Sequence, residues 1–270
     1  MLYLLATPLG NLGDITFRSI ETLKNVEIIY AEDTRRSRIL LDHYEIKKPL
    51  RRYDEHRPLP GSSMEKDLFE GRDIAFISDA GMPLISDPGY ELIQLCLEHK
   101  LPFEVQPGPS AVLLALVNSG LSSHSFVFGG FLPRRRKERR EMLLHYKEYP
   151  ETLIFYETPH RILEALEDTL EVLGERPSCL LREMTKFYEE HLRLNLSELY
   201  NEIKEKPRKG EMVLVIEGAG ESLPLLSPVE QIDTDVESGL KTKEIATKIS
   251  KEYGMSGSDA YRLVLERINK

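Results

Sequence analysis

Short apolar runs alternate with stretches of helical periodicity in the first half of the chain. The apolar runs predict strands at residues 2–6, 26–30, 74–78 and 103–105. Apolar residues also recur every three or four positions, which predicts helices at residues 17–23, 88–99 and 111–118. Ser110 precedes the last of these helices as its N-cap. Strands that alternate with helices are typical of a mainly parallel sheet whose loops gather at the strand ends.

The second half continues this alternation. Strands are predicted at residues 126–128, 152–155, 179–181 and 212–216. Residues 160–173 carry apolar side chains at helical spacing, and Gly174 follows as a helix stop. We therefore predict an α/β protein with an N-terminal α/β domain at residues 1–121. A second domain, α/β or α+β, is predicted at residues 122–220.

The composition changes after residue 220. Residues 221–239 hold five acidic residues, no basic residue and two prolines, which predicts an acidic linker. Residues 240–270 carry seven basic and four acidic side chains. Their apolar positions predict two short helices on either side of residues 254–257. We therefore predict a small helical C-terminal domain at residues 240–270.

Composition narrows the class of protein. The chain has 270 residues, 36 of them basic and 45 acidic, with a formal net charge of −9. This charge excludes a uniformly basic nucleic-acid coat but is compatible with a local basic face. The apolar runs are much shorter than the about 20 residues of a membrane-spanning helix, and no charged leader opens the chain. Together with only two cysteines, these features predict a cytoplasmic protein without a disulfide framework.

Four loops that follow or precede predicted strands are rich in glycine, proline and small polar residues. They lie at residues 7–13, 78–83, 106–111 and 210–212. One such loop is more often an ordinary turn, but four of them predict a ligand crevice at the strand ends. No phosphate-binding P-loop, dinucleotide fingerprint or hydrolase nucleophile elbow is present. The seven histidines lack metal-ligand spacing, so we expect no metal site.

Two clusters of charged residues are candidates for function. Glu32, Asp33 and Arg35 follow a predicted strand, where they would bind a polar substrate, accept a proton or simply cap a helix. Six of the seven residues at 134–140 are basic, which favours RNA or another polyanion over a solvated face. These six residues are Arg134, Arg135, Arg136, Lys137, Arg139 and Arg140.

The ordered set of these segments resembles the tetrapyrrole methylase superfamily. Its members are class III methyltransferases, which bind S-adenosyl-L-methionine in a cleft between two α/β domains. Within the superfamily, the chain is most similar to the methyltransferases that 2′-O-methylate a decoding-centre cytidine of 16S rRNA in the small ribosomal subunit. The similarity rests on residues 7–16, 31–35, 78–89, 106–111, 130–133, 155–157, 182–186 and 210–218.

The resemblance implies a cofactor site and a homodimer. Where Met82 stands the family commonly has threonine, so we expect the backbone to make the contact there. The resemblance assigns twelve residues to the cofactor, the first two of which lie on the first loop. They are Pro8, Leu9, Asp79, Ala80, Gly81, Met82, Ser110, Ala111, Tyr156, Glu157, Met184 and Met212.

The chemistry of the reaction adds expectations for catalysis and RNA binding. A sulfonium methyl group is already activated, so the main task of the protein is to align donor and acceptor. A ribose hydroxyl is a poor nucleophile at neutral pH, and a carboxylate that accepts its proton would help. We expect this role for Asp33 first and Glu32 second. Arg35 and the basic residues at 134–140 are expected to hold RNA.

Two other functions are compatible with these patterns. One is a methyltransferase of a corrinoid or another small molecule on the same fold. Against it stand the basic residues at 134–140 and the basic C-terminal segment. The other is a ribosome-associated module that binds the cofactor without catalysis. Only a measurement of catalysis separates this last function from an enzyme.

Overall fold

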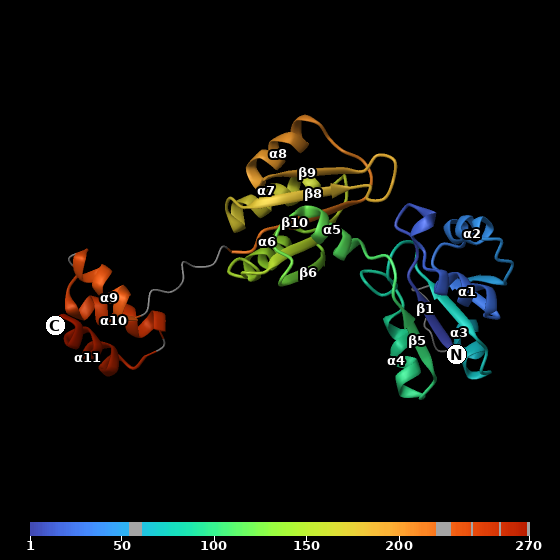
Figure 1. Ribbon diagram of the computed structural model, residues 1–270, viewed down its shortest axis with the longest axis horizontal. Helices are drawn as coiled ribbons and strands as arrows, with labels where there is room; N and C mark the ends of the chain where they lie inside the picture. The colour runs from blue at the N-terminus through green and yellow to red at the C-terminus, as the bar shows by residue number, and fades with distance from the viewer. Residues whose placement is uncertain (54–60, 220–227, 239, 254, 269–270) are drawn as a thin grey trace. The chain divides into compact units, whose positions relative to one another are not determined.

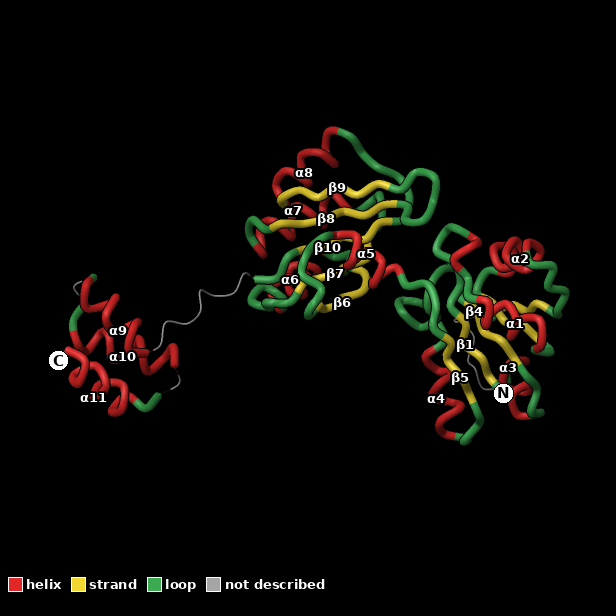
Figure 2. The backbone as a smooth tube through the Cα atoms, in the orientation of Figure 1, coloured by secondary structure: helices red, strands yellow, loops and turns green. Residues whose placement is uncertain are grey.

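A computed structural model describes residues 1–53, 61–219, 228–238, 240–253 and 255–268 (Figures 1 and 2). The chain divides into two compact units, Met1–Gly218 and Ala219–Lys270. The first unit contains two five-stranded sheets, so it combines the two α/β domains predicted from the sequence. Within the described ranges, no helix is both long and apolar enough to cross a membrane.

The first sheet is parallel throughout and has the strand order β3-β2-β4-β1-β5. Its strands are β1 (Leu2–Leu5), β2 (Ile28–Ala31), β3 (Leu50–Arg52), β4 (Ile74–Ile77) and β5 (Phe103–Gln106). The central strands β1, β2 and β4 consist of apolar and aromatic residues because helices cover both faces of the sheet. Strand β3 was not predicted, since it is short and two of its three residues are exposed arginines.

Alternate side chains of these strands form two separate cores. Leu4, Tyr30 and Phe76 pack against α3 (Ser63–Phe69) and α4 (Tyr90–Glu98). Leu5 and Ile77 pack with residues of α1 (Phe17–Asn25) and α2 (Thr34–His43) on the other face. Because the strands run parallel, the loops that follow β1, β4 and β5 lie at the same edge of the sheet. The sequence pattern predicted a ligand crevice at this edge.

The second sheet is mixed and has the strand order β6-β7-β10-β8-β9 (Figure 2). Only β6 and β7 pair in parallel. Strand β9 was not predicted because its residues are largely polar. The strands are β6 (Phe126–Phe131), β7 (Thr152–Glu157), β8 (Pro177–Arg182), β9 (Glu190–Asn195) and β10 (Met212–Ile216).

Helices cover both faces of the second sheet. Helices α6 (Arg136–His145), α7 (Ile162–Leu173) and α8 (Leu196–Glu205) pack on one face. Helix α5 (Ala111–Ser119) packs on the other, where Val112 and Leu116 join the core formed with Ile154 and Val213. The predicted domain boundary after residue 121 therefore differs from the packing, because it assigns α5 to the N-terminal domain. Helix α5 follows the first sheet along the chain but packs against the second.

The second unit is a bundle of three helices, α9 (Pro228–Glu237), α10 (Thr242–Tyr253) and α11 (Gly257–Ile268). Its core contains Ile232, Ile245 and Val264, all fully buried. The predicted linker at residues 221–239 is wrong for residues 228–237, which form α9. Proline suits the first position of a helix, so Pro228 begins α9 rather than excluding it. Residues 221–227 of the predicted linker lie outside the described residues.

Candidate functional site

The loops at the edges of the two sheets enclose a cavity of about 270 Å³ in the first unit. The loops after β1 and β4, the start of α5, the end of β7, the loop after β8 and the start of β10 all contribute to its lining. Ten of the twelve residues that the resemblance assigned to the cofactor line this cavity. They are Leu9, Ala80, Gly81, Met82, Ser110, Ala111, Tyr156, Glu157, Met184 and Met212.

Backbone hydrogen bonds join the first two of these loops. The Thr7 N–H donates to the Gly81 carbonyl, and the Gly81 N–H donates to the Thr7 carbonyl, each at 2.9 Å. The Thr7 hydroxyl donates to the Ser78 carbonyl at 3.1 Å. Gly81 has a φ of +81°, a conformation that favours glycine. A Cβ atom at Gly81 would also come within 3.2 Å of the Leu9 side chain, which lines the same cavity.

An aromatic cluster forms part of the cavity wall. The Tyr156 ring lies edge-to-face with Phe128 and Phe131, at centroid distances of 4.8 and 5.4 Å. Burial, together with the negative charge of Asp87, raises the pKa of Tyr156 to about 12. Tyr156 therefore remains protonated at neutral pH and presents a neutral aromatic surface.

The charged groups of the cavity lining are carboxylates. Asp87, Glu157 and Glu211 line it, and no lysine, arginine or histidine is among its described lining residues. The Glu157 side chain is buried and accepts hydrogen bonds from the Thr158 N–H at 2.9 Å and from Arg161 at 3.1 Å. Burial raises the pKa of Glu157, although these two partners oppose the shift. Glu157 is paired with Arg161 and Glu211 with Lys186, so only part of this negative charge is left for a cationic ligand.

Pro8 and Asp79, which the resemblance also assigned to the cofactor, do not line this cavity. They line a second, smaller pocket of about 130 Å³ on the same β1 loop. The Asp79 carboxylate accepts a hydrogen bond from the Asp33 N–H at 3.1 Å and lies 3.5 Å from a guanidinium nitrogen of Arg36. Asp79 thus organises the start of α2 instead of the main cavity. The first loop separates the two pockets, since Leu9 lines one and its neighbours Pro8 and Gly10 line the other.

The contacts of Asp33 argue against its predicted role as a general base. Neither Asp33 nor Glu32 lines either pocket. The Asp33 side chain caps α2 and accepts two hydrogen bonds from the Arg35 guanidinium, at 2.9 and 3.1 Å. These bonds lower the pKa of Asp33 to about 2, so its carboxylate is a weaker base than an ordinary aspartate. Arg35 remains exposed beside Asp33 and is accessible to a phosphate.

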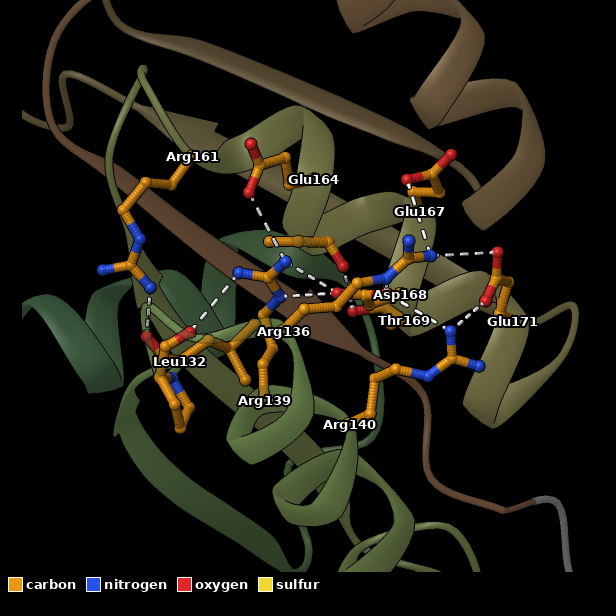
Figure 3. Close-up of polar contacts among 12 residues, drawn as sticks. Leu132, Arg136, Arg139, Arg140, Arg161, Glu164, Glu167, Asp168, Thr169 and Glu171 are labelled. Atoms are coloured by element: carbon orange, nitrogen blue, oxygen red, sulfur yellow. Dashed lines mark hydrogen bonds and ion pairs between the residues drawn. The ribbon is translucent and has the colours of Figure 1, made fainter.

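Half of the basic residues at 134–140 are held in ion pairs between α6 and α7 (Figure 3). Arg139 is buried, and its Nε and a terminal nitrogen contact Asp168 at 2.8 and 2.7 Å. Arg136 also donates to Asp168, and Arg140 pairs with Glu171. The prediction that Arg139 contacts RNA is therefore wrong, because its guanidinium is enclosed in the protein.

The other three basic residues of this segment are exposed. Arg134 precedes α6, while Arg135 and Lys137 have side chains that are 83% and 88% exposed. Their acidic neighbours Glu138 and Glu141 lie in the same helix, at 3.1 and 3.9 Å. Ion pairs this exposed are weak, so the basic side chains can exchange these partners for phosphates.

Several residues that line the cavity were not predicted from the sequence. Ser86 and Asp87 line the cavity at a turn in which Leu84 and Ser86 both have positive φ. The signal was present, since these residues belong to the segment 78–89 that carried the resemblance. The unassigned lining residues are Ile85, Ser86, Asp87, Phe131, Thr158, Pro159, Gly210, Glu211 and Val213.

Comparisons with known proteins identify the family. Residues 1–200 match the family model of the tetrapyrrole (corrin/porphyrin) methylases. The chain belongs to the tetrapyrrole methylase family. A curated relative from Halalkalibacterium halodurans, named ribosomal RNA small subunit methyltransferase I, is 44% identical over 97% of this chain and 93% of its own length. A relative of the same name from Haemophilus influenzae is 42% identical over 100% of this chain and 98% of its own length.

A third relative of this name, from Thermotoga maritima, is shorter. It is 42% identical over 80% of this chain, and 98% of its own length is covered. About a fifth of the present chain thus has no counterpart in that tetrapyrrole methylase.

Solved structures support the fold of the first unit. The cobalt precorrin-4 methyltransferase CbiF, a cobalamin biosynthetic enzyme, has a TM-score of 0.62 and 16% identity over 79% of this chain and 93% of its own. The methyltransferase CobJ gives the same TM-score at 17% identity, over 81% of this chain and 94% of its own. At these identities the likeness concerns the fold alone.

The methyl donor of this tetrapyrrole methylase is S-adenosylmethionine. The cavity fits this molecule in charge. S-adenosylmethionine carries a sulfonium and an ammonium group against one carboxylate, so it is a net cation at neutral pH. Three carboxylates and no basic side chain line the described cavity wall, and Tyr156 and Phe131 offer apolar surface for an adenine. When bound, the cofactor supplies a methyl group already activated by the positive sulfur.

Proposed function

We propose that this methyltransferase modifies 16S rRNA of the small ribosomal subunit, transferring the methyl group to the 2′-oxygen of a decoding-centre cytidine. The curated relatives named ribosomal RNA small subunit methyltransferase I support an rRNA substrate. The cytidine and its 2′-oxygen follow from the resemblance of the motifs. The activity belongs in the cytoplasm, where ribosomal subunits are assembled. The expected homodimer is part of the same proposal, and light scattering would test it.

The observation that carries the proposal is the combination of an acidic, partly aromatic cavity with exposed basic side chains elsewhere on the first unit. Asp87, Glu157 and Tyr156 suit a cationic nucleoside donor. Arg35 and Arg135 are exposed and suit the phosphates of a large anionic acceptor. A small neutral acceptor would gain nothing from these exposed arginines.

The residues of the cavity act mainly by alignment. The paired loops after β1 and β4 hold Leu9 and Gly81 at the cavity wall through the Thr7 backbone bonds. The Arg161–Glu157 pair holds the end of β7 in place, because Arg161 also donates to the Leu132 carbonyl at the end of the β6 loop. Fixed loops of this kind suit a protein whose main task is to align an activated donor with its acceptor.

Tritiated S-adenosylmethionine and small ribosomal subunits purified from a strain without this gene provide the direct test. We expect label in one cytidine, which then resists alkaline cleavage on its 3′ side because the 2′-oxygen is blocked. Label in a base would refute the ribose assignment. Cofactor binding without label in any RNA would indicate either that the substrate is a small molecule or that the chain is a non-catalytic module.

The basic surface has its own test. Changing Arg134, Arg135 and Lys137 together to glutamate should weaken binding to the subunit and make its dependence on salt shallower, since three phosphate contacts are lost. Cofactor affinity measured by calorimetry should not change, because none of the three residues lines the cavity. An unchanged salt dependence would show that this surface does not contact RNA.

A further inference from the structure

The loop between β8 and β9 exposes two adjacent aromatic side chains, which we call the aromatic tip. Phe187 is 93% exposed and Tyr188 is 69% exposed, and their rings meet edge-to-face at 5.0 Å. No other large apolar side chain in the described part of the chain is as exposed as Phe187. Exposing two neighbouring rings to water is unfavourable, so we expect a partner to cover the aromatic tip.

The loop that carries the aromatic tip is ordered by hydrogen bonds. Glu183 and Thr185 have positive φ values of +51° and +67°, which are unfavourable for residues other than glycine. The Thr185 N–H donates to the Glu189 carboxylate at 2.8 Å, and the Lys186 N–H donates to the Glu183 carbonyl at 3.0 Å. The fold thus maintains a strained conformation that presents the two rings to solvent. Strain of this kind clusters at functional sites.

The same loop is attached to the cofactor cavity. Met184 lines the cavity, and the Lys186 ammonium pairs with Glu211, another lining residue, at 2.9 Å. The Lys186 side chain also packs over Gly10, where an added Cβ atom would lie 2.3 Å from its Cγ. Gly10 lines the second pocket on the β1 loop. The aromatic tip therefore follows directly after a lysine that joins both pocket-bearing loops.

We propose that Phe187 and Tyr188 form a stacking platform for unpaired bases of the substrate RNA beside the site of methyl transfer. This inference rests on the proposed function. A ribose within a stacked helix is poorly accessible to a buried donor, so the enzyme must hold the RNA around its target in an opened form. Aromatic side chains replace the lost base stacking, and they do so for any base.

The local charges favour stacking over other contacts. Lys186 is occupied by Glu183 and Glu211, and His191 contacts Glu189 at 2.7 Å. The loop therefore offers rings rather than cations to a partner. Two side chains at a hairpin tip also cover far less than the about 800 Å² per partner of a stable protein interface. Nucleobases fit a patch of this size, whereas a second copy of the chain needs more surface.

A fluorescence experiment tests stacking directly. The chain has no tryptophan, so Phe187→Trp introduces a unique reporter that retains an aromatic ring. We expect its emission to be quenched by unmethylated small subunits and by a short unstructured RNA. Phe17→Trp is the matched control, since Phe17 is 89% exposed on α1 and lines neither pocket. Equal quenching of both reporters, or of neither, would overturn the proposal.

Kinetics of the full-length protein provide the second test. Phe187→Ala/Tyr188→Ala should raise KM for small subunits on the order of tenfold to a hundredfold and leave the cofactor Kd unchanged. Phe187→Tyr/Tyr188→Phe should restore KM, because it keeps both rings. An unchanged KM in the alanine variant would refute the platform. A dimer that the alanine changes convert to monomer would assign the aromatic tip to a second copy. The quenching measurement needs no turnover. It therefore tests base stacking even if the chain methylates no RNA, and a failure of the stacking platform can be told apart from a failure of the proposed function.

Discussion

The Asp168→Asn substitution tests whether the charged residues between α6 and α7 stabilise the fold. Asp168 and Arg139 have side chains that are 1% and 2% exposed, and Asp168 also accepts a hydrogen bond from Arg136 at 2.8 Å. Asparagine preserves the shape but removes the negative charge, so the buried Arg139 guanidinium keeps only the exposed Glu164, at 3.5 Å, as a counter-charge. Breaking a buried pair in this way costs about 3–5 kcal/mol of the free energy of unfolding. For a unit of about 200 residues, the melting temperature falls by about 6–20 °C.

Circular dichroism during heating and urea titration measures this loss. The double variant Arg139→Met/Asp168→Leu should recover most of it, because apolar residues of similar size often replace a buried ion pair without loss. Arg134→Met serves as the control, since Arg134 is exposed and its loss should change stability by less than about 0.5 kcal/mol. Full stability of Asp168→Asn, combined with weaker RNA binding by Arg139→Met, would refute the structural role and restore Arg139 as an RNA contact.

Three further predictions concern the site and the second unit. Asp33→Asn should keep its kcat, because Asp33 lines neither pocket and its carboxylate is bound by the Arg35 guanidinium. The wild type should show no pH step from Asp33 between pH 6 and 9, since its lowered pKa of about 2 keeps it charged there. A hundredfold loss of kcat in the variant would restore it as a base. Gly210→Ala should weaken cofactor binding in calorimetry, since its Cβ would lie 2.4 Å from the Glu183 carboxylate. Gly174→Ala should leave cofactor binding unchanged, because Gly174 also has a positive φ but its Cβ would meet nothing within 4 Å. Removing residues 219–270 should leave cofactor affinity unchanged, because the first unit provides the whole described lining. The shorter relative from Thermotoga maritima also lacks a counterpart for about a fifth of this chain. A tenfold loss of affinity would place the second unit at the cofactor site.

Local sequence patterns were sufficient for the central strands and for most of the cavity. Strands β1, β2 and β4 are buried on both faces, so their sequences are continuous apolar runs. Glycine and proline mark the loops that follow them, since those loops need backbone conformations such as the positive φ of Gly81. The resemblance to the family then assigned Leu9, Gly81 and Tyr156 to the cofactor.

Elements with mixed or polar sequences could not be predicted in the same way. Strand β9 and helix α6 are rich in charged residues and have few apolar positions. Their secondary structure depends on pairing with β8 and packing against α7, which are contacts between distant segments. Helix α9 was missed for a related reason, because its acidic residues and Pro228 resemble a linker until Ile232 is buried by α10 and α11.

The sequence by itself determined the alternation of strands and helices, the loops of the cavity and the resemblance to a methyltransferase family. These properties depend on neighbouring residues, and a linear pattern records them. Only the tertiary structure decided what each charged residue does. Arg139 and Lys137 belong to the same basic run, yet one is buried against Asp168 and the other is exposed, because an α-helix points successive side chains in different directions. Asp33 likewise became a helix cap once Arg35 folded back upon it.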